Sequence, residues 1–277
     1  MSQPSQDTST VPLGTYQEQR PSLNLSAFVV CYWQATGSGG FTSPSYAIIP
    51  DGCVDIVFEL HGSQARCMAF GTTTCVQTFV PAPQATYFGI RFRPGMARYF
   101  LRCSIPELTD NAVTLSSFLT LSPDEVAEGN TLDNQQAMMD QAMSRRLARS
   151  NYTVTRLDQA LRAIQDGRGS LRIDDLANQC GLSTRHFERQ ILDSVGLSPK
   201  RLSRIIRVQA AISFLRRFPH HLLADLALSL GYHDQAHMNR DFSLLTNHTP
   251  TYYQTASTAD LQASNLASLT MSHFSKI

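Results

Sequence analysis

Polar side chains that could hydrogen-bond to the edges of DNA bases occur at helical spacing in the second half of the chain. Arg185, Glu188 and Arg189 are at positions i, i+3 and i+4, which lie on one face of a helix. Arginine can donate two hydrogen bonds to a guanine edge, and glutamate can accept one from the amino group of cytosine. This segment is therefore a candidate for reading bases in a major groove.

A second set of the same kind follows further along the chain. Gln235 and Asn239 are four positions apart, as are Ala236 and Arg240. Glutamine and asparagine match adenine edges, alanine can contact the methyl group of thymine, and arginine can bind guanine or phosphate. The two sets together predict two DNA-reading helices.

An internal repeat contains both sets. Residues 176–181 (LANQCG) match 226–231 (LALSLG) at an offset of 50, and 187–189 match 238–240 at an offset of 51. Each copy predicts a helix, a glycine turn and a second helix, which is the helix-turn-helix pattern. A solvated face explains most single charged helices, but two units in matched register favour DNA recognition.

A long helix is predicted to join the two units. Ser198 and Pro199 are typical of a helix start, and Pro219 prevents the helix from continuing. Its basic residues could contact DNA phosphates or solvent. They are Lys200, Arg201, Arg204 and Arg207.

Residues 158–253 resemble the DNA-binding domain of the AraC/XylS family of bacterial transcriptional regulators. Segment 223–253 carries the resemblance, with a Leu-Gly-Tyr turn followed by Asp-Gln-Ala-His, Asn-Arg-Asp-Phe and Thr-Pro-Thr-Tyr-Tyr. It departs from the family pattern at Met238, where an aromatic residue is usual, and at Asn247, where glycine is usual. The resemblance implies two helix-turn-helix units that read successive major-groove segments of double-stranded DNA.

The chain between residues 23 and 103 has the pattern of short β-strands. Runs rich in Val, Ile, Phe and Tyr alternate with clusters of Gly, Pro and Ser, which predicts a small sandwich or barrel. Helices are expected near 96–101, after Ser122 and Pro123, and over 134–148. The expected strands are 27–33, 46–49, 54–60, 75–80 and 86–92.

This β-rich part resembles the N-terminal domain of one branch of the AraC family. The resemblance lies in the Pro-Asp-Gly-Cys-Val-Asp motif of 50–55 and the Gly-Ile-Arg-Phe-Arg-Pro-Gly motif of 89–95. It implies a cupin-like barrel followed by helices, a domain that usually senses a small molecule or mediates dimerisation. The polar anchors of a ligand pocket are expected among Asp51, Asp55, Arg91 and Arg93.

Other interpretations of the β-rich part stay open. A thiol of Cys53, Cys67 or Cys75 could sense redox state if a nearby arginine lowered its pKa. His61 with Cys53 or Asp55 could belong to a metal site or a cupin-type enzyme, although metal-dependent cupin chemistry needs several closely spaced histidines. In the structural interpretation, residues 50–52 form a turn and the cysteines are core residues.

Charge divides the chain into two parts. Residues 1–150 contain 9 Lys and Arg against 12 Asp and Glu, whereas 151–254 contain 13 against 9, so the net charge of +1 conceals two opposite balances. The predicted organisation has four parts. They are a disordered or extended segment (1–22), a β-rich regulatory or dimerisation domain with trailing helices (23–150), a DNA-binding domain (151–254) and a tail (255–277).

The sequence as a whole predicts an α+β regulator of bacterial promoters. Its polar start does not have the pattern of a signal peptide, and no run approaches 18 apolar residues, so a cytoplasmic protein with reduced thiols is expected. The expected partners are double-stranded DNA, a second copy of the chain, a small-molecule effector and, for an activator, RNA polymerase. No catalytic residue, metal or cofactor is predicted. The alternatives are a ligand-independent regulator whose first domain only dimerises or binds a protein and, more remotely, a cupin-type enzyme.

Overall fold

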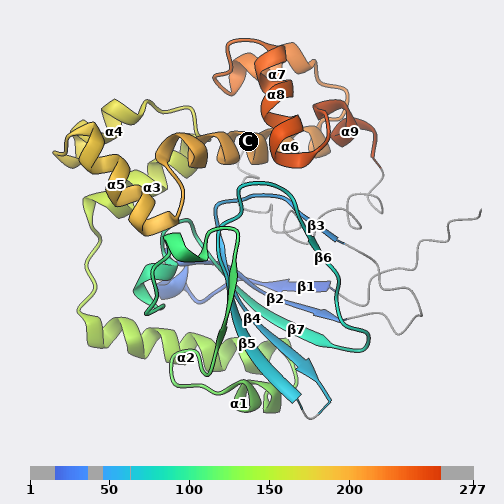
Figure 1. Ribbon diagram of the computed structural model, residues 1–277, viewed down its shortest axis with the longest axis vertical. Helices are drawn as coiled ribbons and strands as arrows, with labels where there is room; N and C mark the ends of the chain where they lie inside the picture. Colours follow the sequence, from blue (N-terminus) through green and yellow to red (C-terminus); the bar gives the residue numbers. More distant parts are fainter. Residues whose placement is uncertain (1–15, 37–45, 63, 257–277) are drawn as a thin grey trace, which may run out of the picture.

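A computed structural model of the protein describes residues 16–36, 46–62 and 64–256. A β-rich domain with trailing helices is followed by an all-helical domain, which confirms the predicted α+β class (Figure 1). The helical domain lies against one end of the sheet, and α2 (Leu132–Ser150) lies on the opposite side of the molecule (Figure 1). Among the helices of the described residues, none combines the length and the apolar character that a membrane crossing needs.

The described strands of the first domain form two antiparallel sheets. The larger has the order β1-β2-β7-β4-β5-β8, and the smaller pairs β3 with β6. The cupin-like barrel stays a prediction, because the edge strands β1 and β8 of the larger sheet do not pair with each other. The strands are β1 (Tyr16–Gln19), β2 (Val29–Thr36), β3 (Tyr46–Ile48), β4 (Val54–His61), β5 (Gln64–Phe70), β6 (Gln77–Phe79), β7 (Thr86–Phe92) and β8 (Ala112–Leu115).

The two faces of the larger sheet have different chemistry because side chains alternate along a strand. On one face, the fully buried Tyr32, Phe58 and Phe88 pack together across β2, β7 and β4. Tyr32 also donates a hydrogen bond of 2.6 Å to Asp140 of α2. The other face carries a row of Cys31, Arg91 and Asp55, which places charged groups inside the domain.

Short helices follow the sheet. The helix start predicted at Ser122 is present, because Ser122 and Glu125 form a reciprocal capping box at the start of α1. The segment expected near 96–101 forms only a short 3-10 helix. These elements are η1 (Leu23–Leu25), η2 (Ala97–Tyr99), η3 (Pro106–Leu108) and α1 (Pro123–Glu128).

The second domain consists of helices, and its glycine turns and the helix start at Ser198 and Pro199 lie where the sequence predicts them. Gly181 and Gly231 have φ values of 71° and 75°, the left-handed conformation that ends the first helix of each unit. The long α6 lies between the two units (Figure 1). The helices are α3 (Arg156–Asp166), α4 (Ile173–Cys180), α5 (Thr184–Val195), α6 (Pro199–Arg217), α7 (Leu223–Ser229), α8 (Gln235–Thr246) and α9 (Pro250–Thr255).

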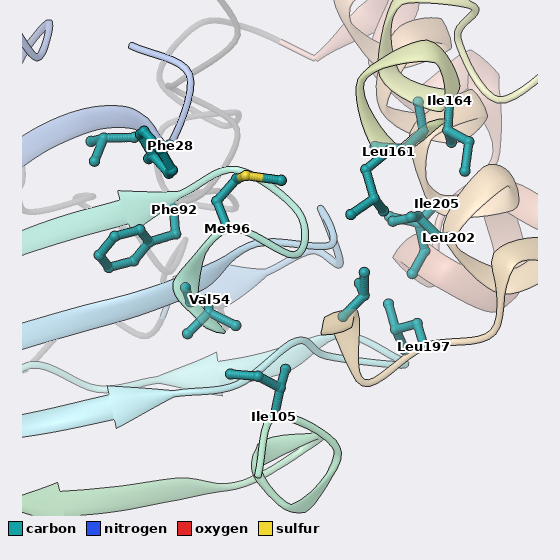
Figure 2. Close-up of a cluster of buried hydrophobic side chains, with 14 of the residues drawn as sticks. Phe28, Val54, Phe92, Met96, Ile105, Leu161, Ile164, Leu197, Leu202 and Ile205 are labelled. Atoms are coloured by element: carbon teal, nitrogen blue, oxygen red, sulfur yellow. The ribbon is translucent and has the colours of Figure 1, made fainter. Parts of the chain in front are cut away.

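One hydrophobic cluster crosses the boundary between the domains. Met96, in the loop after β7, points toward Leu161 of α3, and Leu202 of α6 lies nearby (Figure 2). A polar contact joins the same two domains, because the buried Gln209 of α6 donates a hydrogen bond of 2.6 Å to the carbonyl oxygen of Pro50, in the turn before β4. The two domains are therefore docked through a shared core.

Some boundaries differ from those expected. Strand β1 lies within the segment 1–22, so the ordered first domain begins by residue 16 rather than at 23. Strands β5 and β8 were not anticipated, because their sequences alternate weakly between apolar and polar residues. Residues 1–15 and 257–277, which hold most of the predicted N-terminal segment and tail, lie outside the described residues.

Candidate nucleic-acid interface and ligand cavity

The first helix-turn-helix unit exposes all three residues predicted to read DNA. Ser183 caps α5 by accepting a hydrogen bond from the His186 backbone N–H, and Phe187 and Ile191 are fully buried on the inner side. This orientation leaves one face of α5 in solvent. That face carries Arg185, Glu188 and Arg189.

The second unit places its predicted residues on the outer side of α8. Asp234 caps this helix by accepting from the His237 N–H at 2.6 Å, and Met238 is among the residues buried beneath. Ala236 and Arg240 are exposed, whereas Gln235 and Asn239 are half-buried. The amide oxygen of Asn239 has no hydrogen-bond partner among the described residues.

Among the basic residues of the connecting helix that were predicted to contact phosphates, Lys200 and Arg201 are exposed, whereas Arg204 is paired within the domain. Lys200 is exposed in the first turn of α6. Arg204 instead donates from Nε and Nη2 to one carboxylate oxygen of Asp241, at 3.0 and 2.6 Å. The guanidinium of Arg204 thus holds α8 against α6, and its contact with DNA stays a prediction. The signal for this pair was absent from the sequence, since its members are 37 residues apart.

A cavity of about 260 Å³ lies between the two sheets of the first domain. Asp51, Asp55 and Arg91 line it, as predicted, whereas Arg93 does not: its Nε donates to the Ser26 carbonyl oxygen at 2.8 Å. Sequence reasoning missed Asp110, which also lines the cavity. The apolar lining includes Trp33, Ile48, Val57, Phe70 and Phe79.

The polar wall of the cavity is organised around Arg91. Its Nε is 3.1 and 3.2 Å from the two oxygens of Asp55, and its Nη2 donates to one of them at 3.1 Å. The Asp51 carboxylate is 3.6 Å from the same Nε and accepts the Cys53 backbone N–H at 2.9 Å. Burial raises the pKa of Asp51, Arg91 opposes that shift, and Asp55 adds to it.

Trp33 covers this charged row because the neighbouring strand has no side chain opposite it. Gly89 is its register partner in β7, and a Cβ atom there would lie 2.0 Å from the indole. The indole Nε1 is 3.3 Å from Asp55. The glycine of the Gly-Ile-Arg motif was the available signal for this close approach.

Two of the three cysteines considered for redox sensing are poorly placed for it, whereas Cys75 is exposed. Cys53 and Cys67 are buried and burial raises the pKa of both thiols, to about 12 for Cys67, which opposes a reactive thiolate. His61 is exposed at the end of β4. In the described parts of the chain, no three His, Cys, Asp or Glu side chains converge as metal ligands would.

Comparisons with known proteins agree with this division into two domains. Residues 17–114 match a family described as a domain of unknown function (DUF6597), and residues 176–256 match a helix-turn-helix domain. An uncharacterised HTH-type transcriptional regulator of Haemophilus influenzae is 32% identical over 100 residues, which are 36% of this chain and 33% of that relative. The chain thus matches about a third of the length of this curated relative.

Solved structures of ToxT from Vibrio cholerae are also similar. One of them has 10% sequence identity and a TM-score of 0.40. The similarity covers 80% of this chain and 96% of that ToxT chain. Another ToxT structure, with an unsaturated fatty acid bound, has 12% sequence identity and a TM-score of 0.39. The similarity covers 82% of this chain and 94% of the ToxT chain.

The chain is thus a two-domain α+β protein whose second domain contains two helix-turn-helix units. The helix-turn-helix match, over residues 176–256, overlaps residues 158–253, the segment that resembles the AraC/XylS family.

Proposed function

We propose that the protein is a cytoplasmic bacterial transcriptional regulator that binds double-stranded DNA through α5 and α8. The observation that carries the proposal is the exposure of base-matching side chains on both second helices, each of which is fixed by a buried opposite face. This arrangement supports a binding function for the second domain.

The spacing of the units supports binding to one face of DNA. The connecting α6 has 19 residues, a length of about 28 Å at 1.5 Å per residue. Successive major-groove segments on one face of B-DNA are about 34 Å apart. A rigid helix of this length, with a unit packed near each end, suits two adjacent grooves.

The proposal is tested by selecting preferred DNA sequences with the purified full-length protein. With the selected site, Arg185→Ala and Arg240→Ala should each weaken binding by about 1–3 kcal/mol, because each removes a base or phosphate contact. Arg145→Ala removes an equal charge from an exposed position of α2 and should leave the affinity unchanged. Full affinity in both folded recognition-helix variants would refute the assignment of these residues.

We further propose that the first domain binds a small-molecule effector, and its cavity supports this role. The second candidate is a ligand-independent regulator whose first domain dimerises or contacts a protein, RNA polymerase included. Sedimentation and thermal-shift measurements on the full chain distinguish these two roles of the first domain. Stabilisation by a metabolite supports the effector role. A dimer whose stability no metabolite alters supports the second candidate.

A further inference from the structure

We propose that the cavity of the first domain binds a small organic ammonium compound, with Asp51 as the carboxylate that receives the cation. The inference rests on the proposed effector-binding role of this domain and specifies the chemistry of the effector. Its basis is an excess of carboxylates over cations on the polar wall, combined with an apolar wall of limited size.

The charge of the lining is negative. Asp51, Asp55 and Asp110 line the cavity, and Arg91 is the only basic residue among the described lining residues. Glu18 of β1 adds a further carboxylate close enough to interact electrostatically with Arg91 and Asp55. An anionic ligand would therefore meet strong repulsion, whereas a cation would relieve it.

The single guanidinium of Arg91 faces two carboxylates, those of Asp51 and Asp55. Its Nε is 3.1 Å from an Asp55 oxygen and 3.6 Å from an Asp51 oxygen. The Arg91 side chain is only 6% exposed and cannot turn away to meet a ligand, whereas the Asp51 side chain is 22% exposed. Burial, with a smaller contribution from Asp55, raises the pKa of Asp51, so a ligand cation beside this carboxyl would favour its charged form.

Asp110 has a structural role that leaves Asp51 as the better receptor for the cation. Its two carboxylate oxygens accept hydrogen bonds from the backbone N–H and the hydroxyl of Thr74, at 2.7 and 2.6 Å. These bonds hold together the loops at the rim of the cavity. Asp110 thus adds negative potential, while Asp51 offers the direct contact.

The apolar wall sets the size and character of the rest of the ligand. Trp33, Phe70 and Phe79 supply aromatic surface, which suits a hydrophobic body and also attracts an ammonium group. The volume of about 260 Å³ is just below the usual range of about 300–1,000 Å³ for ligand pockets. The cavity thus fits a short aromatic or aliphatic amine better than a long-chain compound.

The test uses the full-length protein and matched ligands that differ only in charge. The aromatic series is 2-phenylethylamine, 2-phenylethanol and 3-phenylpropionate, and the aliphatic series is butylamine, butanol and pentanoate. Calorimetric titration should give the tightest binding for the amine of at least one series. Equal or tighter binding of the carboxylates, or no binding of either amine, would overturn the proposal.

Two variants, with one control, test whether the amine binds in the cavity. Asp51→Asn should weaken amine binding at least tenfold, while its amide oxygen still accepts the Cys53 N–H. Glu59→Gln removes an equal charge from β4 outside the cavity lining and should leave binding unchanged. Gln77→Lys, which brings an ammonium group into the lining, should also abolish amine binding.

Unchanged amine affinity in both Asp51→Asn and Gln77→Lys would refute the assigned site. The DNA selection uses protein without ligand, so a failure to bind DNA and a failure to bind amines are distinguishable.

Discussion

At the scale of single residues, partners rather than residue type decide what each arginine does. Arg185 and Arg189 are exposed on α5, whereas Arg91 and Arg204 are held by buried or half-buried aspartates. Arg207 lies over the ring of Tyr232, with 4.8 Å between its guanidinium carbon and the ring centroid. A count of basic residues in the second domain thus overestimates the charge available to DNA.

Arg204→Ala should destabilise the protein by about 2 kcal/mol. The change leaves the carboxylate of Asp241, whose side chain is 3% exposed, without its ion partner, and the partial exposure of Arg204 moderates the cost of about 3–5 kcal/mol for a fully buried pair. Denaturant unfolding gives the value. Arg201→Ala, at an exposed position one turn earlier, should change stability by less than about 0.5 kcal/mol. Equal stability of the two variants would contradict the positioning role of Arg204.

Thiol labelling of the native protein should be confined to two of the six cysteines. Cys75 and Cys103 are exposed, and the other four are buried. At pH 8 a reagent such as DTNB should therefore react rapidly with two thiols per chain, and with all six in denaturant. Rapid labelling of Cys53 or Cys67, identified by mass spectrometry, would restore the redox interpretation.

At the scale of elements, strand register builds the cavity wall. Adjacent positions of β2, β7 and β4 align Cys31, Arg91 and Asp55 in one row, and the next row on the same face aligns Trp33, Gly89 and Val57. The small residue in the second row lets the indole lie flat over the sheet. The pairing of β2, β7 and β4 thus produces both the row of charged residues and the indole of Trp33 that covers it.

Gly89→Ala should destabilise the protein by about 1–3 kcal/mol, because the added methyl group would overlap the indole of Trp33. Thermal or denaturant unfolding measures the loss. In a Trp33→Ala background the same substitution should cost much less, since the overlapping group is gone. Additive costs in the double variant would show that the close approach is not the cause.

At the scale of the whole molecule, the first domain holds the C-terminal end of α5, the second helix of the first helix-turn-helix unit. The Thr72 hydroxyl donates to the Val195 carbonyl oxygen at 3.1 Å, and the Thr109 hydroxyl donates to that of Gly196 at 3.0 Å. The turn that carries Asp51 also contacts α6 through Pro50 and Gln209. Short hydrogen bonds therefore link the neighbourhood of the cavity to α5 and α6.

Acid should weaken the contact between the domains through Asp158. Burial would raise the pKa of this carboxyl, but the Thr155 backbone N–H, the Arg98 guanidinium and the Tyr99 hydroxyl together lower it. A folded-state pKa below the unfolded value gives stability that is present above about pH 4 and lost as the pH falls through the folded value. Unfolding measured between pH 7 and 2 should therefore show a smaller acid loss in Asp158→Asn.

Asp166→Asn, at the other end of α3, is the control for this pH dependence and should behave as the parent protein does. An identical acid profile in the parent and Asp158→Asn would exclude Asp158 as the group responsible.

The sequence by itself determined the helix-turn-helix domain, because the signals for its caps, glycine turns and buried faces are local. Ser183 and Asp234 lie three residues from the N–H groups that they cap, and the apolar spacing orients the exposed polar face. Only the tertiary structure decided which charges are free and which groups share the cavity. Arg91 and Asp55 are 36 residues apart and Gln209 and Pro50 are 159 apart, and such pairs depend on strand register and domain docking. Those arrangements minimise the free energy of the whole chain, so no short segment specifies them.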